Sequence, residues 1–156
     1  MEMQALKQVL RESGIVGAGG AGFPTYAKLD ERAEVILMNC AECEPLLKLH
    51  RQLMEQCAEE ILRTFDGMAR AVGAGEAVIG IKREYKSAVK AIERYIDRYP
   101  HMRVQLLDSA YPMGDEVVLI YEATGRVIRP GGLPIEEGVA VFNVETVYNV
   151  CRALEK

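Results

Sequence analysis

A glycine-rich stretch near the amino terminus has the composition of a loop that binds a phosphate or a flat ring. It reads Gly14-Ile15-Val16-Gly17-Ala18-Gly19-Gly20-Ala21-Gly22-Phe23-Pro24-Thr25. Glycine adopts positive φ freely and lets backbone N–H groups approach a ligand closely. The spacing Gly17-x-Gly19-x-x-Gly22 matches the dinucleotide fingerprint G-x-G-x-x-G, but no strand precedes it, so an ordinary Rossmann turn is not predicted. The alternative is a flexible linker, which Phe23-Pro24 disfavours because linkers rarely combine an aromatic residue with proline at a helix start.

Polar clusters follow three of the predicted strands. They lie at residues 39–45, 111–116 and 143–146. In a parallel α/β sheet, ligands bind beyond the carboxyl ends of the strands. Asparagine and carboxylate side chains there could accept hydrogen bonds from ribityl or ribose hydroxyls. As an alternative, Glu42, Glu44, Asp115 and Glu116 are solvated residues at helix starts, where carboxylates suit the helix dipole.

Cys40 and Cys43 form a C-x-x-C pair, a spacing found in metal and redox sites. A zinc or iron–sulfur site needs about four ligands. Cys57 and Cys151 have no matching spacing, and the two histidines are isolated in the sequence. No metal site is therefore predicted, and a thioredoxin-like dithiol at Cys40 and Cys43 remains an alternative.

Composition indicates a globular domain rather than a nucleic-acid-binding or membrane-spanning chain. The chain has 156 residues, 49% of them hydrophobic and 27% charged, with a net charge of −4. A negative net charge disfavours nucleic acid and anionic membranes as partners. No apolar run approaches the roughly 20 residues of a membrane span, and the first residues do not resemble a signal peptide. Four cysteines do not make a disulfide scaffold, so a reducing, cytoplasmic location is predicted.

Strand and helix patterns alternate along the chain, and these elements must position the polar clusters. Short apolar runs predict strands at 35–38, 77–81, 102–107 and 139–142. Helical periodicity predicts helices at 3–13, 24–30, 45–70 with a late start or a break near His50, 85–96, 115–123 and 144–155. We therefore expect an α/β, Rossmann-like three-layer sandwich with a mostly parallel sheet of about four strands. The glycine-rich loop precedes the first strand, and residues 1–156 form a single domain.

Taken together and in order, the motifs resemble one family. They are Gly17-Ala-Gly-Gly-Ala-Gly-Phe-Pro-Thr25, Asn39 with Glu42-Cys-Glu-Pro45, Tyr111 with Gly114-Asp-Glu116, and Asn143-Val-Glu-Thr146. The combination resembles the FMN-binding domain of the NADH-oxidising flavoprotein subunit of respiratory complex I. The segments 41–47, 111–114 and 131–134 resemble more closely the RnfC subunit of the Rnf electron-transport complex and the RnfC-like cobalamin reductases of propanediol utilisation. The resemblance covers nearly the whole chain.

The resemblance implies non-covalently bound FMN as cofactor and NADH as electron donor. The residues that match flavin-contacting positions are Gly17, Gly19, Gly20, Lys28, Asn39, Glu42, Tyr111, Gly114, Glu116, Asn143 and Thr146. Among these, Asn143 and Thr146 match positions near the FMN phosphate. Phe23 and Glu44 match positions near NADH.

Some positions depart from the complex I pattern. Ala18 replaces an arginine, Phe142 replaces the first of two asparagines, and Gly132 lies where an aromatic residue helps to hold a ring of the donor. NADH binding is therefore implied less strongly than FMN binding. The ubiquitin-like and iron–sulfur domains of relatives are not expected within these residues.

The predicted function is that of the flavin domain of an NADH:acceptor oxidoreductase. It accepts a hydride from NADH onto FMN and passes electrons singly to an iron–sulfur or other acceptor, and no side chain is needed as acid or base. Expected partners are NAD(H), an iron–sulfur protein or domain, and subunits of a membrane complex. The expected location is cytoplasmic or peripheral on the cytoplasmic face of such a complex. Two alternatives remain: a non-catalytic FMN-binding relay or assembly module, and a cytosolic dithiol protein that uses Cys40 and Cys43.

Overall fold

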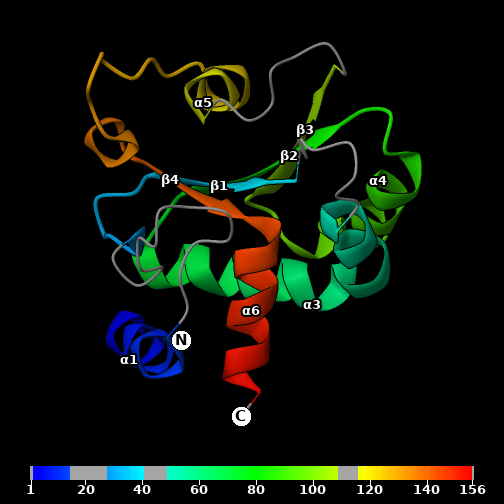
Figure 1. The fold of residues 1–156 in the computed structure, drawn as a ribbon, viewed down its shortest axis with the longest axis horizontal. Helices are drawn as coiled ribbons and strands as arrows, with labels where there is room; N and C mark the ends of the chain where they lie inside the picture. The colour runs from blue at the N-terminus through cyan, green and yellow to red at the C-terminus, as the bar shows by residue number, and fades with distance from the viewer. Residues whose placement is uncertain (1, 15–27, 41–48, 109–115, 156) are drawn as a thin grey trace.

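The computed structural model describes residues 2–14, 28–40, 49–108 and 116–155 (Figure 1). The predicted helix at 24–30 falls mostly outside these ranges. The α-helices are α1 (Met3–Ser13), α3 (Leu49–Val72), α4 (Lys86–Glu93), α5 (Glu116–Thr124) and α6 (Val144–Leu154), with 3-10 turns η1 (Ile96–Arg98) and η2 (Pro134–Glu137). The strands are β1 (Val35–Asn39), β2 (Glu76–Lys82), β3 (Met102–Leu107) and β4 (Val139–Asn143).

The strands form one sheet in the order β3-β2-β1-β4, and every pair is parallel. Parallel strands cannot be joined by tight hairpins, so each pair of consecutive strands is connected by a helical crossover. The chain therefore adds β2 and β3 on one side of β1 and returns to place β4 on the other. This confirms the predicted α/β class.

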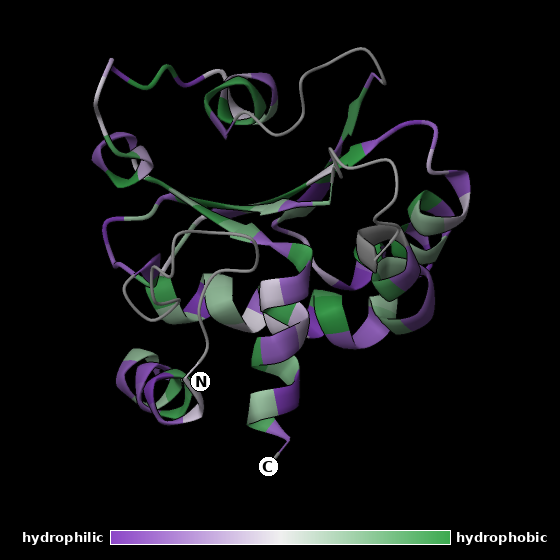
Figure 2. Ribbon diagram, viewed as in Figure 1, coloured by the Kyte–Doolittle hydropathy of each residue, from purple (hydrophilic) through white to green (hydrophobic). Residues whose placement is uncertain are grey.

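Helices cover both faces of the sheet (Figure 1). Along β1, Ile36 and Met38 lie in the larger core with α1, α3, α4 and α6, whereas Val35 and Leu37 lie in a smaller core with α5. Successive strand residues point to opposite faces. The apolar run of β1 is thus buried on both sides, as predicted, and Figure 2 shows the strands at the centre as largely hydrophobic.

Two helices differ from their predicted course. The helix predicted over 45–70, with a late start or a break near His50, is α3, which is described from Leu49 on, and its kink lies at Cys57, where φ of −127° and ψ of 24° are not helical. The helix predicted over 85–96 ends at Glu93 and is followed by η1. Ile96, which continued the apolar periodicity of that helix, packs on the larger core from the 3-10 turn instead.

At the amino ends of β1 and β4, the side chain of Arg126 links the residues that precede the two strands. Arg126 Nη1 donates to Glu34 Oε1 at 2.7 Å and to the carbonyl oxygen of Glu137 at 2.6 Å. The backbone N–H groups of Glu34 and Val35 donate to the carbonyl oxygen of Gly138. Gly138 has φ of +74°, and a Cβ atom there would lie 2.6 Å from Glu34 Oε1 and 2.8 Å from Arg126 Nη1.

We expect Gly138→Ala to lower the free energy of unfolding by about 1–3 kcal/mol, measured by urea denaturation. The new methyl group separates Glu34 from Arg126 in addition to straining a left-handed residue. Gly125→Ala is the matched control, because Gly125 has φ of +75° and a Cβ atom there would meet nothing within 4 Å. Equal losses in the two variants would show that the contact with Glu34 and Arg126 adds nothing.

Candidate functional site

The carboxyl ends of the two strands that carry predicted site residues lie side by side. Asn39, the last residue of β1, is in register with Asn143, the last residue of β4, and with Gly80 of β2. The two asparagines are more than a hundred positions apart in the sequence. Because ligands of parallel sheets bind beyond this edge, the register places both predicted residues where a ligand is expected.

Asn143 determines where α6 begins. Its φ of −78° and ψ of 147° are those of an N-cap residue, and its Oδ1 accepts a hydrogen bond from the backbone N–H of Glu145 at 2.8 Å. Thr146 lies in the first turn of the same helix and is only 2% exposed. The amino end of α6, which carries a partial positive charge, therefore lies at the carboxyl edge of the sheet, where it suits an anionic group.

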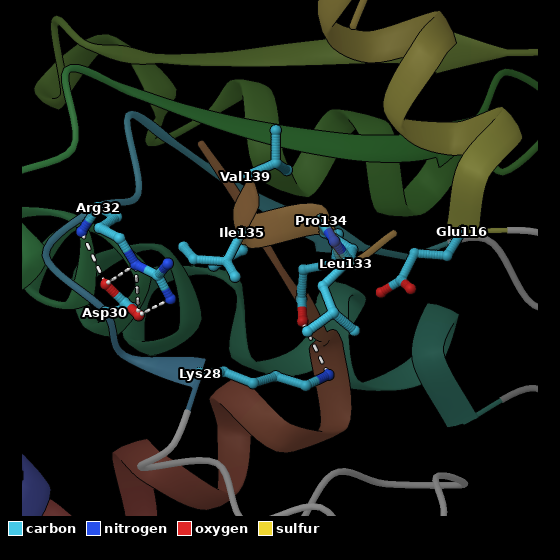
Figure 3. Close-up of a pocket in the computed structure, with 10 residues that line it drawn as sticks. Lys28, Asp30, Arg32, Glu116, Leu133, Pro134, Ile135 and Val139 are labelled. Carbon is cyan, nitrogen blue, oxygen red and sulfur yellow. Dashed lines mark hydrogen bonds and ion pairs between the residues drawn. The ribbon is translucent and has the colours of Figure 1, made fainter. Parts of the chain in front are cut away.

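The Lys28 side chain lies beside β4. Its Nζ donates to the carbonyl oxygen of Val141 at 3.2 Å (Figure 3). Among the described residues β4 pairs with β1 alone and so lies at one edge of the sheet. The positively charged ammonium group of Lys28 thus lies beside β4. In the sequence, Lys28 directly follows residues 15–27, which include the glycine-rich loop.

A cavity of about 330 Å³ brings Lys28 together with Glu116, the first residue of α5. The rest of the wall is formed by the charged pair Asp30 and Arg32, which precede β1, and by apolar residues of η2, the residue before it and β4. Figure 3 shows Glu116 on one side of the cavity and the Asp30–Arg32 pair on the other. The ten lining residues are Lys28, Asp30, Arg32, Glu116, Leu133, Pro134, Ile135, Val139, Ala140 and Val141.

Sequence reasoning missed Asp30 and Arg32 as site residues. The Asp30 carboxylate accepts hydrogen bonds from the backbone N–H of Arg32 at 2.8 Å, from Nε at 3.1 Å and from Nη2 at 2.8 Å. The hydrogen bond from the Arg32 side chain is the main cause that lowers the pKa of the Asp30 carboxyl. The Asp-x-Arg spacing was the available signal, but an Asp side chain that hydrogen-bonds the backbone two residues on is an ordinary feature of turns.

Several predicted residues lie outside the described part of the chain. They are Gly17, Gly19, Gly20, Phe23, Glu42, Glu44, Tyr111 and Gly114. Their nearest described neighbours are known: residues 15–27 lead into Lys28, residues 41–48 follow Cys40, and residues 109–115 lead into Glu116. Lys28 and Glu116 line the cavity, and Cys40 follows the last residue of β1.

The first cysteine of the C-x-x-C pair is a core residue. Cys40 is 1% exposed, and burial raises the pKa of its thiol. The thiolate is the form that attacks disulfides and binds metals, so this environment disfavours both activities at Cys40. Cys43 lies outside the described residues. In the part of the chain that the structure describes, no three His, Cys, Asp or Glu side chains are grouped as a metal site would require.

Comparison with known proteins identifies the family. The model of the family described as the Nuo51 FMN-binding domain matches residues 10–152. The chain belongs to this family. Cobalamin reductase PduS of Salmonella typhimurium is 44% identical over 97% of this chain and 33% of its own length. A subunit of the Na(+)-translocating ferredoxin:NAD(+) oxidoreductase complex of Acetobacterium woodii is 34% identical over 99% of this chain and 36% of its own.

Solved structures agree with this assignment. A chain of an NAD+-reducing [NiFe]-hydrogenase in the air-oxidized state superposes with a TM-score of 0.85 at 27% identity, over 99% of this chain and 31% of that one. The chain thus spans about a third of the length of each of these three relatives. The resemblance to complex I and RnfC-like flavoproteins is confirmed, and the FMN-binding family domain accounts for almost all of the described fold.

Family membership makes the chain an FMN-binding domain of the Nuo51 type. The described residues suit a flavin nucleotide. The amino end of α6 can face a phosphate, Lys28 supplies a cation, and the cavity beside β4 has mainly apolar walls for a flat ring. No helix within the described ranges is long and apolar enough to cross a bilayer.

Proposed function

We propose that the chain is the FMN domain of an NADH-dependent electron-transfer oxidoreductase. The observation that carries this proposal is the alignment of Asn39 with Asn143 at the edge where α6 begins, in a chain of the FMN-binding family. When bound, FMN supplies the redox chemistry, taking two electrons from NADH and passing them on one at a time. The protein binds and orients the two nucleotides, so no acidic or basic side chain has to move a proton.

The roles of the site residues follow from their positions. The amino end of α6, capped by Asn143, holds the FMN phosphate, and Thr146 supports this first turn. Lys28 places its cation beside the flavin nucleotide. Asn39 offers a side-chain amide at the neighbouring strand end for the ribityl hydroxyls. The remaining flavin contacts are assigned to Gly17, Gly19, Gly20, Glu42, Tyr111, Gly114 and Glu116.

The electron donor and acceptor belong to the same proposal. Phe23 and Glu44 contribute to the NADH site. An iron–sulfur protein or domain accepts the electrons, in keeping with relatives that are named as a cobalamin reductase and as subunits of ferredoxin:NAD(+) oxidoreductase complexes. We place the protein in the cytoplasm or on the cytoplasmic face of such a complex.

One turn favours the alternative of an FMN relay module with weak affinity for NADH. Gly131 has φ of +74°, and a Cβ atom on Gly132 would lie 3.0 Å from the carbonyl oxygen of Arg129. The turn therefore has little room for the aromatic residue that the resemblance to complex I places near this position. Aromatic stacking contributes about 0.5–1.5 kcal/mol beyond area burial, so its loss weakens NADH binding by roughly tenfold or less.

Anaerobic stopped-flow absorbance of the FMN-loaded protein tests the proposal. We expect NADH to bleach the flavin with a high apparent KM and an artificial acceptor to complete turnover. We expect NADPH to be slower, because its extra phosphate approaches an acidic rim that includes Glu42 and Glu44. If saturating NADH leaves the flavin oxidised, the donor site belongs to another domain or partner, and the relay alternative holds.

A further inference from the structure

A second cavity, of about 310 Å³, lies among three helices that pack on the larger core. Its apolar walls include Leu6 of α1, Met68 of α3 and Leu154 of α6. Figure 1 shows these three helices on the same side of the sheet. Helix α6 begins at the carboxyl edge of the sheet, whereas Leu154 is its last residue. This three-helix cavity is therefore separate from the candidate flavin site.

Thr64 of α3 places an unpartnered hydroxyl group in the wall of the three-helix cavity. The residue is only 8% exposed, yet among the described residues its hydroxyl has no hydrogen-bond partner. Thr124 differs, because its Oγ1 donates to the carbonyl oxygen of Ile120 at 2.7 Å, as helical threonines commonly do. A buried polar group without a partner is destabilising and calls for an explanation. A polar ligand in the cavity would give the Thr64 hydroxyl its partner.

Gly67 keeps the same cavity open. It lies inside α3, where glycine is less favourable for helix stability than alanine. A Cβ atom on Gly67 would meet nothing within 4 Å, so no neighbouring atom requires glycine at this position. Because Gly67 lines the cavity, a larger side chain would occupy part of its space. The sequence thus retains an unfavourable helix residue at the point where any other would narrow the cavity.

The charged residues that line the cavity favour a ligand with one negative charge. Arg63 lines it and forms no ion pair within the described ranges. Glu155 also lines it, but this carboxylate accepts a hydrogen bond from Cys151 Sγ at 3.8 Å and pairs with Arg152 Nε at 3.8 Å. The charge left without a partner is therefore the cation of Arg63, which suits a carboxylate.

We infer that the three-helix cavity binds a small monocarboxylate with an aliphatic body. The carboxylate accepts hydrogen bonds from the Thr64 hydroxyl and the Arg63 guanidinium, and the aliphatic body lies against the apolar walls. A phosphate dianion suits the cavity less well, because Glu155 repels the second charge and the apolar walls do not solvate it. The inference is independent of the proposed function, since the cavity includes none of the residues assigned to FMN or NADH.

Octanoate and 1-octanol are matched probes, because they share an aliphatic chain and differ in charge. Calorimetric titration of the FMN-loaded protein should show saturable binding of octanoate, with 1-octanol weaker by about 3- to 10-fold. Arg63→Gln should remove this preference by weakening octanoate binding alone. Arg94→Gln is the matched control and should keep the preference. Arg94 is an exposed arginine at the carboxyl end of α4, also without an ion pair among the described residues.

Two further variants test the wall of the cavity. Thr64→Val is nearly isosteric and should raise the Kd for octanoate by about 3- to 10-fold. It should not lower the Tm, because the lost hydroxyl has no partner in the protein. Gly67→Leu should abolish octanoate binding and raise the Tm by about 2–4 °C, since leucine fills the space and favours the helix. Gly67→Ala should give a smaller loss of binding, and FMN affinity should be unchanged throughout.

Three results would overturn the inference. Equal affinity of the wild type for octanoate and 1-octanol would show that the cavity does not select a carboxylate. Unchanged octanoate binding in the Gly67→Leu variant would place the ligand elsewhere on the protein. A wild type that binds FMN but not octanoate would remove the carboxylate site and leave the proposed function intact, whereas a wild type that binds octanoate but not FMN would do the reverse.

Discussion

Gly20→Val should abolish FMN binding while the protein stays folded. Gly20 belongs to the loop of closely spaced glycines and lies outside the described residues, so the prediction rests on the sequence and on family membership. A branched side chain there occupies space that the flavin ring needs and restricts the backbone angles of the loop. Fluorescence titration with FMN should show no saturable binding, and circular dichroism should show an unchanged helical signal. Gly19→Val should behave in the same way.

Gly75→Val is the control for this experiment. Gly75 precedes β2 at the opposite, amino end of the strands, its φ is not in the left-handed region, and a Cβ atom there meets nothing within 4 Å. It should bind FMN like the wild type. A folded Gly20→Val variant with wild-type FMN affinity would mean that the glycine-rich loop does not contact the flavin nucleotide.

Lys28→Met should weaken FMN binding by about tenfold to a hundredfold. A hydrogen bond to a charged group contributes about 1.5–3 kcal/mol, and methionine keeps most of the length of the side chain without its charge. The variant also loses the hydrogen bond from Nζ to the Val141 carbonyl, a part-buried contact worth about 0.5–1.5 kcal/mol of folding free energy. Calorimetric titration with FMN at fixed salt concentration gives the change in Kd.

Thermal unfolding of the same Lys28→Met sample separates the two effects. A small drop in Tm together with a large rise in Kd is the expected pair of results. Lys90→Met on the exposed surface of α4 removes the same charge far from β4 and should change neither quantity. Lys28→Met with unchanged Kd would show that Lys28 serves only to hold the Val141 carbonyl of β4.

The order of strands and helices could be predicted because the spacing of hydrophobic residues along each segment indicates which of its side chains are buried. The run 35–38 has no polar alternation, which indicated a strand buried on both faces, and β1 is buried between two cores. Helix ends were less predictable. Ile96 continues the apolar spacing of α4, yet the helix ends at Glu93, and Ile96 packs on the core as the first residue of a 3-10 turn.

The candidate site could be predicted only in part, because a site depends on which strand ends are neighbours. Sequence patterns indicated that Asn39 and Asn143 follow strands, but only the order β3-β2-β1-β4 places them in register. The Asp30–Arg32 pair was missed because its importance comes from the cavity wall that it shares with Ile135, a residue far away in the sequence. Burial of Cys40 was likewise invisible in the C-x-x-C spacing.

The most direct measurement of the central claim is a visible spectrum of the protein after reconstitution with FMN and removal of free flavin. The account predicts a yellow protein with flavin absorbance, close to one FMN per chain, and preference for FMN over FAD in calorimetric competition. Denaturation should release unmodified FMN, because no covalent bond is involved. A colourless protein that also gives no heat of binding with added FMN would contradict the proposed function and leave only the fold.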